Sequence, residues 1–229
     1  RIAYASSFGV SSIPDECKWL YKEYLPKFSS IGVREKNAVG MVKELAEKDA
    51  TWVLDPTLLL DKENWKKVGK SPYKNLGNYI LLYELTPCPY ILELAKHFRE
   101  KTGMSIIRIC KNACAEDKDC TIMNIVDAGP AEFIDLFSKA GMVITNSFHG
   151  TAFSINFGKD FYTVTPARKH NNSRQQSILE LFGLQERLIA ENTPIGDIST
   201  KDIDHNAVAT KLNIEREKSI KFLKNAIEE

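Results

Sequence analysis

The sequence lacks the features that would mark a membrane-spanning or nucleic-acid-binding protein. No apolar run approaches the ~20 residues that cross a bilayer, and no secretory signal peptide is visible. An excess of one charge is also lacking, because 31 basic residues are balanced by 30 acidic ones and the net charge is +1. A nucleic-acid surface requires a basic excess, so we expect neither a membrane span nor a nucleic-acid partner.

Cysteine is scarce and irregularly spaced. The odd number of Cys, five in 229 residues, and the lack of a secretion signal favour reduced thiols in the cytoplasm. Cys110, Cys114 and Cys120 lie close together, but this group has no C-x2-C pair and no His, which are typical of zinc sites. We therefore predict no metal and interpret the group as a polar loop with incidental thiols.

The composition is that of an ordinary globular protein. Hydrophobic residues make up 43% of the chain and charged residues 27%, and 229 residues suffice for one large or two small domains. The sequence starts with Arg1-Ile-Ala-Tyr4, without a Met and inside an expected strand. We therefore expect that part of the first domain precedes Arg1.

Short apolar runs alternate with segments of helical periodicity along most of the chain. This alternation predicts a parallel sheet with helices on both faces. The expected strands are residues 2–6, 30–34, 51–54, 79–83, 105–110, 142–145 and 161–165. The expected helices are residues 14–28, 36–48, 90–102, 127–139, 149–157, 174–182 and 206–227, the last interrupted near Asn213.

The expected elements fall into two α/β series. Residues 65–78 are rich in Lys, Gly, Pro and Asn and show no periodicity, which indicates a linker. Residues 1–62 are then the C-terminal part of a first α/β domain, and residues 63–229 form a second, Rossmann-like domain with a C-terminal helix. Two doubly wound domains of this kind define the glycosyltransferase-B type of fold, with the first domain present only in part.

The segment Met142–Phe157 carries the strongest functional signal. A strand, a small polar turn and a helix place His149 at the carboxyl edge of a parallel sheet, where ligands bind in open α/β sheets. The helix start, with Ser147, Gly150 and Thr151, suits a phosphate or carboxylate because its N–H groups carry partial positive charge. His149 is the first candidate catalytic residue; a core-edge His that is satisfied by backbone groups is the alternative.

Seven short motifs follow one another along the chain: Tyr4-Ala-Ser-Ser-Phe-Gly9, Gly32-Val-Arg-Glu35, Leu54-Asp-Pro-Thr-Leu-Leu-Leu60, Tyr79-Ile-Leu-Leu-Tyr83, Gly129-Pro-Ala-Glu-Phe133, Thr145-Asn-Ser-Phe-His-Gly150 and Ser173-Arg174. Their order resembles that of the polysaccharide pyruvyl transferase family. The resemblance implies transfer of a pyruvyl group from phosphoenolpyruvate to a sugar of a cell-surface polysaccharide or its lipid-linked precursor, with formation of a ketal. It implies no cofactor, and a cytoplasmic enzyme held at the inner face of the membrane through its substrate.

The resemblance also implies roles for two residues. It makes His149 the general acid, and a His with a pKa near working pH suits delivery of a proton to the methylene carbon of the enol phosphate. It makes Arg34 a donor-binding residue, because a planar guanidinium matches a carboxylate or a phosphate. A simple ion pair of Arg34 with Glu35 or another neighbouring acid is the alternative.

Further substrate-binding residues are expected in polar turns. Ser7 lies in a strand-end turn, while Arg168 and Arg174 lie in or beside a polar loop. Many members of the family have Arg two residues before the His, where this chain has Ser147. Because Ser cannot neutralise a phosphate, we expect that charge to come from Arg174 or Lys169.

Two other functions stay open on the sequence. Ser147 in place of Arg is compatible with a glycosyltransferase of the same fold that uses a nucleotide-sugar donor. The incomplete first domain is compatible with a non-catalytic module that binds a glycan or an anion.

Overall fold

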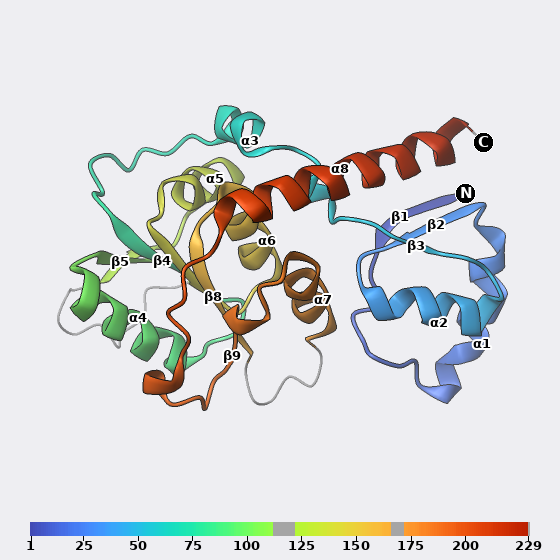
Figure 1. Cartoon of the computed structure of the whole chain (residues 1–229), viewed down its shortest axis with the longest axis horizontal. Helices are drawn as coiled ribbons and strands as arrows, with labels where there is room; N and C mark the ends of the chain where they lie inside the picture. Colours follow the sequence, from blue (N-terminus) through green and yellow to red (C-terminus); the bar gives the residue numbers. More distant parts are fainter. Residues whose placement is uncertain (112–121, 166–171, 229) are drawn as a thin grey trace. The chain divides into compact units, whose positions relative to one another are not determined.

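The computed structural model describes residues 1–111, 122–165 and 172–228 (Figure 1). The chain divides into two compact units. The first comprises Arg1–Leu59, His170–Gly183 and Thr210–Glu229, and the second Leu60–Lys169 and Leu184–Ala209. Each unit thus draws on segments that are distant in sequence, and the domain boundary between residues 62 and 63 stays a prediction.

The first unit contains a three-stranded parallel sheet with the strand order β1-β2-β3. Its strands are β1 (Ile2–Ser6), β2 (Ser30–Val33) and β3 (Thr51–Trp52). The connecting helices and 3-10 segments are α1 (Asp15–Tyr24), η1 (Leu25–Lys27), α2 (Lys36–Ala46) and η2 (Pro56–Leu58).

Helices cover both faces of this small sheet. On one face, the apolar side of α2 packs against β2, and Val42 and Val33 belong to the same buried cluster. On the other face, Phe222 of α8 (His205–Glu228) lies so near β2 that a Cβ on Gly32 would come within 2.8 Å of its ring. Gly32 is therefore the residue that lets this helix approach the sheet. Helix α7 (Ser173–Phe182) joins the unit, since the backbone N–H of Lys36 donates to its Ser177 hydroxyl (3.2 Å).

The second unit contains a six-stranded parallel sheet with the order β6-β5-β4-β7-β8-β9. The strands are β4 (Tyr79–Tyr83), β5 (Ser105–Ile109), β6 (Ile122–Ile125), β7 (Met142–Thr145), β8 (Asp160–Thr165) and β9 (Leu188–Ala190). The chain starts in the centre at β4, runs outward to β6, and returns to β7 on the other side of β4. The order reverses between β4 and β7, and such a point is where ligands bind in doubly wound sheets.

Alternating residues of the central strand β4 face two helical layers. Ile80 and Leu82 pack in the cluster formed with α4 (Pro89–Thr102). Tyr83 on the other face contacts Phe133 of α5 (Pro130–Lys139), with ring centroids 5.0 Å apart. The remaining elements of this unit are α3 (Lys62–Val68), α6 (Phe148–Phe157), η3 (Gln185–Arg187) and η4 (Ile195–Asp197). The prediction of a mixed α/β fold with parallel sheets is confirmed.

Two sequence predictions about elements are wrong, and two short strands were missed. The linker predicted at residues 65–78 contains part of α3, which begins after Asp61, whose side chain accepts from the N–H of Asn64 (2.8 Å). Trp65 of α3 packs edge-on against Phe153, with centroids 5.3 Å apart. Helix α8 continues without interruption through Asn213. The short strands β6 and β9 were not predicted.

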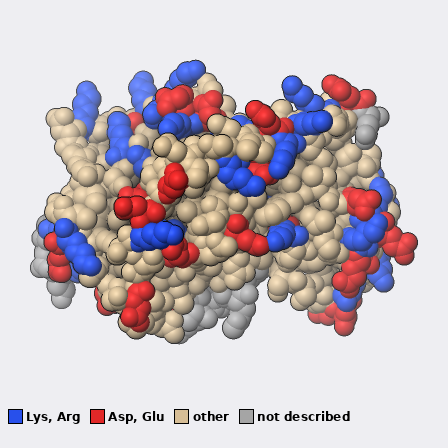
Figure 2. All heavy atoms as spheres, in the orientation of Figure 1, with Lys and Arg blue, Asp and Glu red and all other residues tan. Residues whose placement is uncertain are grey.

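The surface carries charges of both signs. On the face shown in Figure 2, basic and acidic side chains are interspersed, in agreement with the net charge of +1. Within the described ranges, no helix is both long and apolar enough to cross a membrane.

Candidate active site

The strand–turn–helix predicted around His149 is present in the second unit. Strand β7 ends at Thr145, and α6 begins at Phe148. The turn lies at the carboxyl edge of the sheet, beside the reversal point between β4 and β7. His149 lies in the first turn of α6 and its side chain is exposed, so a general acid at this position is accessible to a ligand.

The other polar residues of this motif are buried and hold the turn. The Thr145 hydroxyl donates to the carbonyl of Tyr83 (2.5 Å) and accepts from the N–H of Ser147 (3.0 Å). The Ser147 hydroxyl caps α6 by accepting from the N–H of Gly150 (3.3 Å). The Thr151 hydroxyl is 2.7 Å from that of Thr163 on β8. Substrate contacts of Ser147, Gly150 and Thr151 stay a prediction, and their side chains or backbone already serve the turn.

Asn146, which follows β7, is hydrogen-bonded to the loop that follows β4. Its Nδ2 donates to the carbonyl of Thr86 (2.6 Å), and its Oδ1 accepts from the N–H of Leu85 (2.8 Å). Asn146 is 3% exposed, so both bonds are shielded from water. The amide therefore fixes the loop between β4 and α4 against the turn that carries His149.

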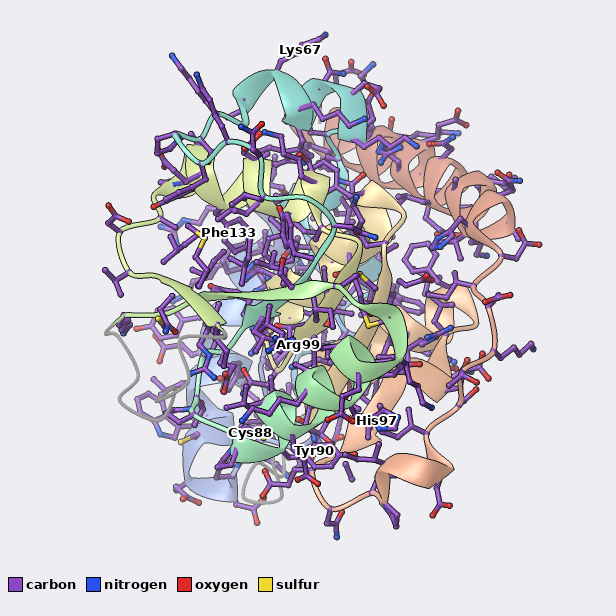
Figure 3. The ribbon with its side chains drawn as sticks, turned by 90° about the vertical axis from the view of Figure 1, so that its left-hand side faces the viewer. Lys67, Cys88, Tyr90, His97, Arg99 and Phe133 are labelled. Atoms are coloured by element: carbon purple, nitrogen blue, oxygen red, sulfur yellow. The ribbon has the colours of Figure 1, made fainter. Side chains whose placement is uncertain are left out.

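A pocket of about 760 Å³ opens at the carboxyl ends of β4, β5 and β6. Its lining includes Glu84, Arg108 and Lys111, and apolar side chains form much of the rest. Cys88 lines it at the start of α4 (Figure 3). Burial raises the pKa of the Cys88 thiol, and the carboxylate of Glu191, 3.7 Å from its Sγ, acts in the same direction. The thiol is thus the neutral form at physiological pH and a poor nucleophile.

The carboxyl edge of the sheet in the first unit carries Arg34. Its Nη1 pairs with Oδ2 of Asp55 at 2.5 Å, and its side chain is 19% exposed. Asp55 also caps η2 by accepting from the N–H of Thr57 (2.9 Å). Burial raises the pKa of Asp55, but the bonds from Thr57 and Arg34 outweigh burial and hold it below its ordinary 3.8. The acid beside Arg34 is therefore Asp55 and not Glu35, and donor binding by Arg34 stays a prediction.

Ser7 lies at the same edge and is already hydrogen-bonded. Its hydroxyl donates to Oε1 of Glu35, which also accepts from the N–H of Gly9 (3.4 Å). Glu35 is 1% exposed. Ser7 thus helps to bury an acid, and its substrate contact stays a prediction.

The remaining predicted residues are placed as follows. Arg174 is half-buried in the first turn of α7, in the first unit. Arg168, Lys169, Cys114 and Cys120 lie outside the described residues. Across residues 1–111, 122–165 and 172–228, no group of three or more His, Cys, Asp or Glu could hold a metal ion.

Sequence reasoning missed Arg108, Glu84 and Asn146. A signal for Arg108 was present, because a charged residue interrupts the apolar run of β5, Ser105–Ile109. Asn146 belongs to the motif Thr145–Gly150, but the sequence did not indicate a role for it. Glu84 follows directly after β4, at the edge where ligands bind.

A doubly wound parallel sheet with an exposed His at its carboxyl edge is the arrangement in which open α/β proteins bind their ligands. The sequence model of the polysaccharide pyruvyl transferase family matches residues 1–167, well over half of the chain. The chain therefore belongs to this family, and the resemblance seen in the motifs is confirmed. Arg174 lies beyond the matched residues.

One solved structure is similar in part. The UDP-GlcNAc 2-epimerase from Methanocaldococcus jannaschii shares 13% identity with the chain at a TM-score of 0.39. The match covers 80% of this chain and 48% of the epimerase, so the chain spans about half of that protein. No curated protein sequence matches the chain.

Proposed function

We propose that the protein transfers a pyruvyl group from phosphoenolpyruvate to a sugar of a cell-surface polysaccharide or its lipid-linked precursor. Membership of the pyruvyl transferase family supports this function. The observation that carries it is that the polar side chains around His149 are buried in the turn, while His149 itself is exposed at the carboxyl edge.

In the proposed reaction, His149 protonates the methylene carbon of phosphoenolpyruvate. This carbon becomes a methyl group, and positive charge develops on the carbon that carries the phosphate. Two hydroxyls of the sugar attack that carbon, phosphate leaves, and a cyclic ketal forms. Of the two hydroxyl protons, one replaces the proton that His149 supplied and the other leaves with phosphate. General acid catalysis of this kind contributes about 10²–10⁴-fold to a rate.

The donor carries a carboxylate and a phosphate, so its binding requires cations. Arg34, Arg168 and Arg174 are the proposed cationic residues, with Ser7 as a neutral partner. The N-terminus of α6 adds partial positive charge beside His149. The proposal includes a glycosyltransferase-B type of architecture and a cytoplasmic enzyme that meets its acceptor at the inner face of the membrane.

The test is release of phosphate from phosphoenolpyruvate by the full-length protein, with and without surface glycan. We expect phosphate release only with glycan, together with a new ketal methyl signal in the proton NMR spectrum of the glycan. Ser147, which leaves no cation two residues before His149, motivates a second arm with nucleotide diphosphates. Thermal stabilisation by a nucleotide diphosphate but not by phosphoenolpyruvate, without phosphate release, would favour a nucleotide-sugar donor instead.

A further inference from the structure

Arg108 is a buried cation with a donor that the described part of the protein does not use. It lies on β5 and is 5% exposed. Among the described residues, its Nε has no hydrogen-bond partner. Among the described residues it pairs with Glu84, with Nε and Oε1 3.8 Å apart, which is beyond hydrogen-bond distance.

The Glu84 pair does not account for this burial. Oε2 of Glu84 already accepts from the N–H of Cys88 (3.0 Å), so the carboxylate is held toward the start of α4. A buried ion pair is stabilising only where its geometry is good and its remaining donors are satisfied. A buried donor without a partner costs free energy, and no described residue supplies a hydrogen-bond acceptor for this Nε.

The place of Arg108 indicates what that partner is. The residue lines the pocket of about 760 Å³ at the carboxyl ends of β4, β5 and β6. A guanidinium only donates hydrogen bonds, and its planar fork matches phosphate and carboxylate. Lys111 contributes a second cation to the lining, while Leu85, Leu92 and Val126 supply apolar walls. Glu84 offsets one charge, so the three ionised groups sum to +1.

We propose that this pocket binds an oxyanion, a phosphate or a carboxylate, that belongs to a larger substrate, and that Arg108 holds it. The source of the oxyanion rests on the proposed function, which offers two. One is phosphoenolpyruvate, for which Arg108 would supply the charge that Ser147 does not. The other is the phosphate linkage of a lipid-linked saccharide acceptor.

Calorimetric titration of the full-length protein distinguishes the sources, with phosphoenolpyruvate and inorganic pyrophosphate as separate probes. Arg108→Gln should weaken the binding of one probe about 10- to 100-fold, the range for a hydrogen bond to a charged group. Weaker binding of phosphoenolpyruvate by the variant assigns the pocket to the donor. Weaker binding of pyrophosphate assigns the pocket to the phosphate linkage of the acceptor. Arg99→Gln is the matched control, because Arg99 lies on α4 of the same unit (Figure 3) and is not among the residues that line the pocket.

A second variant tests the pocket in case Arg108→Gln does not fold. Val126→Trp adds bulk to the pocket wall at a side chain that is 50% exposed, without removing a charge. It should cause the same selective loss of binding. The melting temperature of ligand-free Arg108→Gln should not fall relative to that of Arg99→Gln, because Nε has no hydrogen-bond partner among the described residues and the Glu84 pair is beyond hydrogen-bond distance.

Two results would overturn the proposal. One is unchanged binding of both probes in Arg108→Gln, or no binding of either probe by the unaltered protein. The other is a lowered melting temperature of Arg108→Gln with unchanged binding, which would make Arg108 structural. Since binding is measured without turnover, a protein that binds through Arg108 but forms no ketal would contradict only the proposed function.

Discussion

At the scale of single residues, the motif around His149 contains buried side chains that hold the turn and one exposed side chain. Thr145 and Ser147 are fully buried and use their hydroxyls to hold the turn. His149 is exposed. A sequence pattern identifies all of these residues together, but only the structure shows which side chain is available to a ligand.

Gly150 should not tolerate a side chain. A Cβ at this position would lie 2.4 Å from Oγ1 and 2.9 Å from Cβ of Thr145, both in the buried turn. We expect Gly150→Ala to lower the free energy of unfolding by about 1–3 kcal/mol, as overpacking does. Gly40→Ala is the control, because a Cβ on that helical glycine would meet no neighbouring atom within 4 Å. This variant should raise the free energy of unfolding by about 0.5–1 kcal/mol, because Ala favours a helix more than Gly does. Equal urea midpoints for the two variants would contradict the steric account.

The Arg34–Asp55 pair should make stability depend on pH. The folded-state pKa of Asp55 lies below its ordinary 3.8. The ionised Asp55 therefore contributes its full stabilisation of the folded state above pH 3.8. This stabilisation is lost as the pH falls through the lower folded-state pKa. Asp55→Asn should cost about 1.5–3 kcal/mol at pH 7, the range for hydrogen bonds to charged groups.

The difference between Asp55→Asn and the unaltered protein should shrink in urea titrations below pH 3.8. Asp49→Asn is the control, because Asp49 pairs with Lys43 with its side chain 95% exposed, and surface pairs contribute little. A difference that stays constant down to about pH 2 would show that the charge of Asp55 is not what stabilises the edge.

At the scale of elements, helix α6 depends on its cap. The Ser147 hydroxyl satisfies the N–H of Gly150 in a region shielded from water. Ser147→Ala should lower the free energy of unfolding by about 0.5–2 kcal/mol, and Ser147→Gly should lower it less because Gly is tolerated at an N-cap and buries no charge. The comparison of the two variants by chemical denaturation tests the cap, and an Ala variant as stable as the unaltered protein would exclude it.

Element predictions succeeded where local pattern decides structure. The long strands and helices around β4, α4 and β7 have apolar periods that the sequence displays. The strands β6 and β9 lie at the two edges of the sheet and have four and three residues, so pairing with a neighbour defines them rather than their own pattern. Asn213 is exposed, and its low helix propensity is too small a cost to break α8. Asp61 was an overlooked cap signal for α3.

At the scale of the whole molecule, the sequence could not reveal how distant segments combine. The first unit takes α7 and most of α8 from the C-terminal third of the chain. Gly32 is an example. The sequence does not reveal why this strand residue has no side chain, because the reason is the ring of Phe222, which is distant in the chain and which a Cβ on Gly32 would clash with. The pocket of Arg108 likewise joins three strand ends, from Tyr83 to Ala128, that no local pattern connects. Of the candidate site, the sequence predicted the exposed His149 and missed Arg108.

The most direct test of the central claim compares ketal formation by His149→Ala and His97→Ala in the full-length protein. His97 lies on α4 of the same unit, carries no motif, and controls for loss of an imidazole. The account predicts that His149→Ala lowers kcat/KM for phosphoenolpyruvate at least about 100-fold, while His97→Ala leaves it unchanged. Activity of His149→Ala within a few-fold of the unaltered protein would contradict the account.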